Sequence, residues 1–244
     1  MKLLKSILSF RADPIGIIAY DPRMKPMTTA LLLALALLAV GSAEARHHRS
    51  SQQSSVPGQF DYYLLTLSWS PAYCVVHPDD ASQCRGRGFG FVLHGLWPQF
   101  DAGGYPQYCG DPSLPPEAVA LGARIYPSPK LVRHEWERHG TCSGLGPVGY
   151  FKAADRATAA LRIPALFEAP RADQSLTAQQ IQDAFHGANP ALPSDSLTLA
   201  CSRGELSEVR VCLTRDLRVR PCGRGVRNSC PREPVRIRSV RQGH

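Results

Sequence analysis

Eight cysteines constrain the fold of this 244-residue chain more than any other feature. All of them lie between positions 74 and 230, and no two have the Cys-x-x-Cys spacing that structural zinc sites use. An even number of cysteines without that spacing favours four disulfides formed in an oxidising compartment. We therefore expect a disulfide-stapled domain, although spacing alone does not say which cysteines pair.

The N-terminal part has the composition of an export signal. A lone Lys25 precedes an apolar run over 30–40, which ends in small residues and an Ala-x-Ala site at 43–45. That run is too short to cross a membrane. We expect residues 1–45 to be a signal peptide cleaved after Ala45, with Met24 or Met27 as an alternative start. The mature protein is expected to be exported, to the periplasm or the medium, without a membrane anchor.

The remainder has the length of one ordinary domain. Residues 46–58 are polar and aperiodic, and we expect a disordered lead-in there. Residues 59–230 are expected to form the domain itself. Residues 231–244 contain four arginines and few apolar side chains, which predicts a basic C-terminal tail. The formal net charge of +8 is compatible with a polyanionic partner, but a charge of this size is common.

Strand and helix patterns are separated along the chain. Aromatic and Leu-rich runs predict strands over 60–69 and 88–96, and alternation predicts a hairpin of 197–201 with 206–213. Helices are predicted over 115–126, 129–139 and 150–161, and a capping box at Thr177-x-x-Gln180 opens another that ends near Gly187. The prediction is an α+β fold with a central antiparallel β-sheet and several helices packed around it.

The segment over 129–139 carries an unusual polar face. Glu135 and His139 are four residues apart, Arg138 lies between them and His134 beside them, within an arc of roughly 140°. A solvated stripe of ion pairs would give the same pattern. The His-Glu-x-x-x-His order also resembles the zinc peptidase signature, but its histidines are five residues apart instead of four and would not converge on one ion.

A second histidine motif is His94-Gly-Leu-Trp-Pro98, at the end of a predicted strand. A lone histidine there is usually a structural hydrogen-bond partner, and a lone tryptophan is usually part of the core. Taken together, the two motifs supply two imidazoles, a carboxylate and a guanidinium. This set is able to move protons around a phosphodiester without a metal, because imidazole exists in both protonation states near neutral pH.

These segments resemble the ribonuclease T2 family, secreted enzymes that include the plant self-incompatibility ribonucleases. The resemblance rests on His94–Pro98 and on His134-Glu-Trp-x-Arg-His-Gly-Thr-Cys142. It extends to Leu-x-Leu-Ser-Trp-x-Pro at 65–71 and to the hairpin at 206–212, and covers most of 59–230. It implies a metal-independent, cofactor-free endoribonuclease that cleaves single-stranded RNA to a 2′,3′-cyclic phosphate and then a 3′-phosphate. DNA lacks the 2′-hydroxyl nucleophile and should not be cut. We expect a monomer.

The resemblance also implies residue roles. His139 would be the base that activates the 2′-hydroxyl, and His94 the acid that protonates the leaving 5′-oxygen, with Glu135 as the third catalytic residue. The phosphate would be surrounded by His134 and Arg138, and a base would bind at Trp97 and Tyr105. The family commonly has lysine where this chain has Arg138, which keeps the charge but cannot donate a proton.

The disulfide pairing implied by the resemblance is Cys74–Cys84, Cys109–Cys142, Cys201–Cys230 and Cys212–Cys222. Two other functions are compatible with the sequence. One is a secreted homologue that binds RNA or another partner without cutting, and the arginine at position 138 is compatible with that function. A disulfide-rich structural or adhesive domain would require both histidine motifs to be accidental.

Overall fold

The computed structural model describes residues 56–240, which belong to one compact unit over 53–244. The predicted signal peptide at 1–45 and most of the predicted lead-in lie outside the described residues. Between residues 56 and 240, no helix is both long enough and apolar enough to cross a bilayer.

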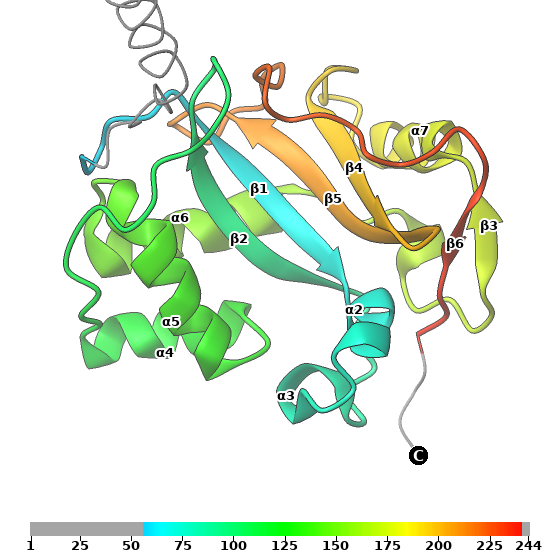
Figure 1. Cartoon of the computed structure of the whole chain (residues 1–244), viewed down its shortest axis with the longest axis horizontal. Helices are drawn as coiled ribbons and strands as arrows, with labels where there is room; N and C mark the ends of the chain where they lie inside the picture. Colours follow the sequence, from blue (N-terminus) through cyan, green and yellow to red (C-terminus); the bar gives the residue numbers. More distant parts are fainter. Residues whose placement is uncertain (1–55, 241–244) are drawn as a thin grey trace, which may run out of the picture. The chain divides into compact units, whose positions relative to one another are not determined.

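A six-stranded sheet organises this unit (Figure 1). Its strands are hydrogen-bonded in the order β2-β1-β5-β6-β3, and β4 pairs with β5 off this path. The strands span β1 (Tyr62–Trp69), β2 (Phe91–Gln99), β3 (Gln174–Leu176), β4 (Leu197–Ser202), β5 (Glu205–Leu213) and β6 (Val235–Ile237). The helices are α2 (Ser70–Val76), α3 (Ala81–Cys84), α4 (Pro116–Ile125), α5 (Pro129–Arg138), α6 (Gly146–Ala160) and α7 (Ala178–Ala188), with short 3₁₀ turns at Gly140–Cys142 and Ala165–Phe167.

The α+β class is therefore confirmed, with two corrections. The sheet is mixed, because β5 pairs in parallel with β6 through Glu205 and Arg236. The expected C-terminal tail is wrong over 235–240: Val235 and Ile237 are fully buried in the core, and β6 joins the sheet. The pattern was missed because its apolar residues alternate with arginines, so that the segment reads as basic although every second side chain is buried.

Helices cover one face of the sheet. The side chains of Tyr63, Leu65 and Leu67 alternate into the main core, where they join residues of α6 such as Phe151. Figure 1 shows α6 passing behind β1 and β2, with α7 beside β4. The opposite face of β1 carries Leu64 and, further along, smaller polar side chains. That face is left for a cleft.

A β-bulge interrupts β2 at the first histidine motif. Thr66 of β1 pairs with Gly95, but Leu67 pairs with Leu93, so His94 is an extra residue without a partner in β1. In a regular strand His94 and Trp97, three residues apart, would point to opposite faces. The bulge removes that difference, so both side chains point away from the core.

Four disulfides staple the unit, with the pairing that the resemblance implied: Cys74–Cys84, Cys109–Cys142, Cys201–Cys230 and Cys212–Cys222. Helix α5 begins as its sequence predicts, with the Ser128 hydroxyl accepting a hydrogen bond from Leu131 N and Pro129 in the first turn. The short helix α2 was not predicted. Pro71, two residues after the predicted first strand, lies in the first turn of this helix.

Candidate active site

A cleft of about 510 Å³ brings all seven predicted site side chains together. They come from β2, from the loop that follows it and from the C-terminal half of α5, and they are His94, Trp97, Tyr105, His134, Glu135, Arg138 and His139. The two histidine motifs are therefore spatial neighbours, although about 40 residues separate them in sequence. Leu64 of β1 and Gln99 of β2 also line the cleft.

Trp97 links the two motifs. Its Nε1 donates a hydrogen bond to Glu135 Oε2 at 2.7 Å, and its ring stacks on His139 with ring centroids 5.2 Å apart. Gly95 permits this arrangement, because a Cβ at that position would overlap both Trp97 Nε1 and Glu135 Oε2. One face of the indole is thus occupied by the His139 ring, and the remaining surface lines the cleft.

Gly140 has the same function at the other motif. A Cβ on Gly140 would overlap Trp136, which is buried in the core, and would lie 2.9 Å from Tyr150 Cδ1. The chain can therefore turn sharply after α5, and His139, the C-cap residue of this helix, lies against the cleft wall. Both His-Gly pairs exist because the glycine lets a neighbouring side chain approach closely.

His139 lies in a poorly solvated position that disfavours its cation. Its side chain is 6% exposed, and Nδ1 is buried with no hydrogen-bond partner in the described residues. Burial lowers its pKa to about 3, and the positive charges of Arg138, His134 and His94 act in the same direction. His139 is therefore neutral across ordinary pH, as a general base must be.

His94 has the opposite electrostatic environment. Its Nδ1 is 2.7 Å from Glu208 Oε1 on β5. Burial lowers the pKa of His94, but the hydrogen bond to Glu208 and the negative charges of Glu135 and Glu208 outweigh it, so the pKa lies above the usual value. The imidazolium form is thereby favoured, as a general acid requires.

Glu135 is the most deeply buried polar side chain of the cleft, with 0% exposure. Burial raises its pKa to about 7, against the opposing effects of His94 and of the Trp97 hydrogen bond. Oε2 already accepts a hydrogen bond from Trp97, whereas Oε1 has no partner in the described residues. Below neutral pH the carboxyl group therefore carries a proton, which Oε1 is free to hold and donate.

Arg138 and Tyr105 face each other across the mouth of the cleft. Arg138 Nη2 donates to the Tyr105 hydroxyl at 3.0 Å, and this bond raises the already high pKa of the guanidinium. The loop that follows Tyr105 is fixed to the end of α5, because Tyr108 N donates to Arg138 O and Cys109 is bonded to Cys142. Desolvation, then the charge of Arg138, lowers the pKa of His134, so the neutral form of this ring is favoured.

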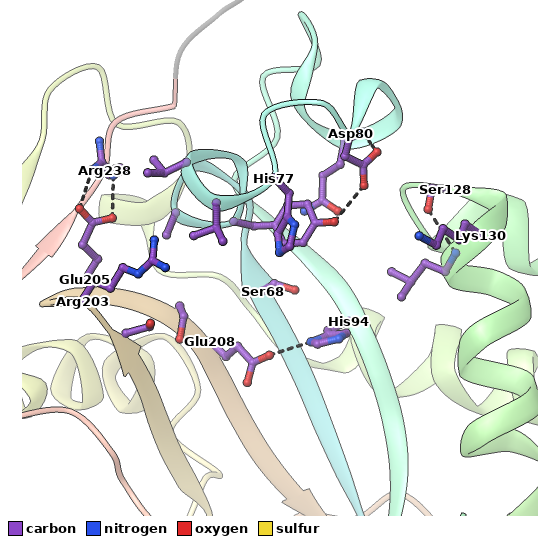
Figure 2. Close-up of a pocket in the computed structure, with 18 of the residues that line it drawn as sticks. Ser68, His77, Asp80, His94, Ser128, Lys130, Arg203, Glu205, Glu208 and Arg238 are labelled. Carbon is purple, nitrogen blue, oxygen red and sulfur yellow. Dashed lines mark hydrogen bonds and ion pairs between the residues drawn. The ribbon is translucent and has the colours of Figure 1, made fainter. Parts of the chain in front are cut away.

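A second cavity, of about 640 Å³, meets the cleft at His94 and His134. It lies between α2, the first turn of α5 and the β4–β5 hairpin, and its lining includes Ser68, Lys130 and Glu205. Figure 2 shows His94 at its edge with a bond to Glu208, and the separate Glu205–Arg238 ion pair on the far side.

Sequence reasoning missed Glu208 and Arg210, which reach the site from β5. Their signal was present: they alternate with Val209 and Val211 in the predicted hairpin and so share one polar face. What was missing was the pairing of β5 with β1, which turns that face toward His94. Within residues 56–240, no group of three or more histidines, cysteines or carboxylates is arranged to hold a metal ion.

Comparison with known proteins identifies the family. A model of the ribonuclease T2 family matches residues 60–222, which include both histidine motifs. The chain belongs to the ribonuclease T2 family. A ribonuclease of Aeromonas hydrophila is 50% identical over 103 residues, 42% of this chain and 47% of that protein. A probable ribonuclease of Haemophilus influenzae is 31% identical over 193 residues, 72% of this chain and 65% of that protein. The matches thus span less than two thirds of either relative.

Solved structures of ribonucleases and of a related protein share the fold. Ribonuclease MC1 from bitter gourd seeds is 25% identical, with 73% of this chain and 99% of that chain aligned at a TM-score of 0.53. A variant of ribonuclease MC1 in complex with 5′-UMP is 26% identical and aligns 71% of this chain with 96% of that chain, at a TM-score of 0.57. An RNase-related protein from Calystegia sepium has a TM-score of 0.62 at 22% identity, over 75% of this chain and 98% of that chain.

Proposed function

We propose that this chain is a metal-independent endoribonuclease that cleaves single-stranded RNA through a 2′,3′-cyclic phosphate. The observation that carries the proposal is the convergence of two imidazoles with oppositely shifted pKa values on one cleft, in a chain of the ribonuclease T2 family. Titratable pairs whose environments separate their pKa values are the usual basis for assigning acid and base.

In the first step, neutral His139 takes the proton of the ribose 2′-hydroxyl, whose oxygen attacks the adjacent phosphorus. Cationic His94 gives a proton to the 5′-oxygen, which leaves as an alcohol, and the product is a 2′,3′-cyclic phosphate. In the second step the roles exchange, and water opens the ring to a 3′-phosphate. The depressed pKa of His139 and the raised pKa of His94 support this direction of proton flow.

Three further groups would stabilise the charge that develops on the non-bridging oxygens. Arg138 supplies a fixed positive charge, and its Nε–H is buried without an acceptor among residues 56–240. Protonated Glu135 would donate from Oε1, the oxygen that Trp97 leaves free. A neutral acid at this point also avoids repulsion between a carboxylate and the phosphodiester anion. His134 completes the polar wall as a neutral hydrogen-bond donor.

The nucleoside 5′ to the scissile bond would stack on the Trp97 and Tyr105 side of the cleft, next to His139. That a ribonuclease MC1 variant was solved with 5′-UMP supports nucleotide binding within this fold. The indole is also a support for His139, so its loss should impair both base binding and catalysis. We further propose that the protein acts after export, since its four disulfides require an oxidising compartment.

The direct test incubates purified protein with RNA and with single-stranded DNA of the same sequence, in excess EDTA. We expect loss of RNA, intact DNA and a transient product that carries a 2′,3′-cyclic phosphate. RNA that stays intact from pH 4 to 9 while still binding the protein would replace the enzyme with a non-catalytic binding homologue. Cleavage that requires a divalent metal would overturn the two-histidine mechanism.

A further inference from the structure

His94 does not stand alone, because a carboxylate from another strand holds it. Glu208 Oε1 contacts His94 Nδ1 at 2.7 Å, and Glu208 Oε2 accepts from Arg210 Nε at 2.8 Å and from Arg210 Nη2 at 2.5 Å. Both carboxylate oxygens are thus engaged, and the Glu208 side chain is only 13% exposed. Figure 2 shows Glu208 extending from β5 to meet the imidazole.

The strand register explains how these side chains meet. Glu208 pairs with Ser68 and Arg210 with Thr66 on the central strand β1, while the bulge in β2 places His94 beside the same two residues. Ser68 and Thr66 are small, so His94 and Glu208 can approach each other over β1. A larger side chain at either position would separate them.

The pair fixes both the orientation and the protonation of His94. A carboxylate that accepts the Nδ1 proton leaves Nε2 as the ring nitrogen that faces substrate. The same carboxylate stabilises the imidazolium, and it remains ionised because its hydrogen bonds and Arg210 outweigh the effect of burial. His139 has no such partner on its Nδ1 among the described residues.

We propose that Glu208, held by Arg210, is a positioning residue that keeps His94 oriented for protonating the leaving 5′-oxygen. Glu208 acts through His94 and does not itself touch the substrate. The proposal rests on the proposed function and adds two residues outside the two histidine motifs. Its competitor is a purely structural role, in which the ion pair joins β2 to β5 and influences catalysis only through stability.

The leaving group distinguishes these roles. A dinucleoside phosphate expels an alkoxide, which needs a proton, whereas a nucleoside 3′-(4-nitrophenyl phosphate) expels a stabilised phenolate, which does not. For E208Q we expect kcat/KM on the dinucleoside phosphate to fall at least about tenfold, as for other residues that orient a functional histidine. On the nitrophenyl ester we expect a change of less than about threefold, because the acid is dispensable there.

E205Q is the matched control. Glu205 lies on the same strand, is 15% exposed, and forms an ion pair with Arg238 on the far side of the second cavity. E205Q should therefore lose a similar amount of thermal stability. The ratio of its kcat/KM on the dinucleoside phosphate to that on the nitrophenyl ester should not change. E208D serves as a second Glu208 variant that retains the carboxylate, and its rate ratio should fall between wild type and E208Q.

The pH dependence gives an independent readout. Loss of Glu208 removes a group that raises the pKa of His94, so the alkaline limb of kcat/KM should move to lower pH in E208Q. The other charged or titratable groups around His94 are not mutated in this variant; they come from β5 and from α5 and its end, and they are Arg210, His134, Glu135 and His139. The charge of Glu208 also raises the pKa of Glu135, so the accompanying shift of Glu135 moves the alkaline limb in the same direction.

The outcomes separate this proposal from the proposed function. If H94A loses the dinucleotide reaction selectively and E208Q does not, His94 remains the acid and the positioning role is wrong. Equal losses on both substrates in E208Q, with a lowered melting temperature, would also overturn it in favour of the structural role. If H94A itself shows no selectivity for the leaving group, the assignment of His94 in the proposed function fails first.

Discussion

The sheet side and the helix side of the cleft each carry a histidine, and they shift the pKa of that histidine in opposite directions. On the sheet side, His94 is paired with Glu208, and its pKa is raised. On the helix side, His139 is stacked on Trp97 next to Arg138, and its pKa is lowered to about 3. Burial lowers the pKa of both rings, but at His94 the hydrogen bond to Glu208 and the nearby carboxylate charges outweigh it, whereas at His139 the guanidinium of Arg138 adds to it. Opposite pKa shifts of this kind are what the proposed acid and base roles of the two imidazoles require.

The walls also differ in how they are held. His94 is fixed by an ion pair across three strands, whereas His139 is fixed by packing, by Gly140 and by a disulfide three residues later. We therefore expect mutations on the sheet side of the cleft to change activity by changing the charge around His94. Mutations on the helix side should change activity by displacing His139.

Removing either imidazole should have the largest effect. H139A and H94A should each reduce RNA cleavage by about 10²–10⁴-fold, the usual value of one positioned proton transfer. With a nitrophenyl leaving group, H139A should remain defective because the 2′-hydroxyl still needs a base, whereas H94A should recover most of its rate. H186A on α7, outside the cleft, is the control. An active H139A would remove the base assignment.

Adding one methyl group at Gly95 should have the next largest effect. In G95A the new Cβ would overlap Trp97 Nε1 and Glu135 Oε2, so the hydrogen bond between the two motifs must break. We expect about a 10²-fold loss of kcat/KM, the usual result of displacing catalytic groups by about an ångström, and about 1–3 kcal/mol of lost stability. The control is G187A, where an added Cβ meets nothing within 4 Å and activity should not change.

Removing the Cys109–Cys142 disulfide at the end of α5 should have a smaller effect on activity. That effect should be larger than the one caused by removing another disulfide of similar contribution to stability. Replacing Cys109 and Cys142 by serine should cost about 2–5 kcal/mol and reduce activity by about tenfold at a temperature where the protein is still folded. Cys201–Cys230 closes a loop of similar length, 29 residues against 33, but does not join the end of α5 to the loop after Tyr105. Its removal should cost similar stability with little loss of activity. Equal activity losses would contradict the tethering role.

The site on α5 follows from local sequence, whereas the site on the sheet depends on strand pairing. The polar face of α5 was predicted correctly because helical periodicity alone places His134, Glu135 and Arg138 together. The shared direction of His94 and Trp97 depends on a bulge, and the sequence contains no plain signal for one. Glu208 needed the order of strands, which depends on long-range pairing and not on local pattern.

The pKa shift of His139 was the other property that the sequence could not predict. The sequence places His139 near Glu135 and the helix C-terminus, which favour its cation, and beside Arg138, which opposes it, so the sequence does not give the direction of the pKa shift. The structure settles the direction through burial, a quantity that no local pattern supplies. Glu135 is itself buried, with its pKa raised to about 7, so it does not offset that effect.

The smallest expected effect tests the charge beside His139. The acid limb of kcat/KM reports a base that must be deprotonated, so for the wild type it should fall only as the pH approaches about 3. Arg138 lowers the pKa of His139, and removing its charge in R138Q should raise that pKa and move the acid limb to higher pH.

R138K is the matched comparison, because it keeps the positive charge but loses the planar guanidinium that bonds Tyr105. Its acid limb should stay close to that of the wild type, and kcat/KM should change only a few-fold if the role is electrostatic. A large gain in R138K would instead mean that this position donates a proton, which an arginine cannot do. A pH profile that is the same in R138Q and the wild type would show that the charge of Arg138 does not contribute to the pKa of His139. The opposite pKa shifts would then be caused chiefly by burial at His139, and nearby charge would be decisive at His94 alone.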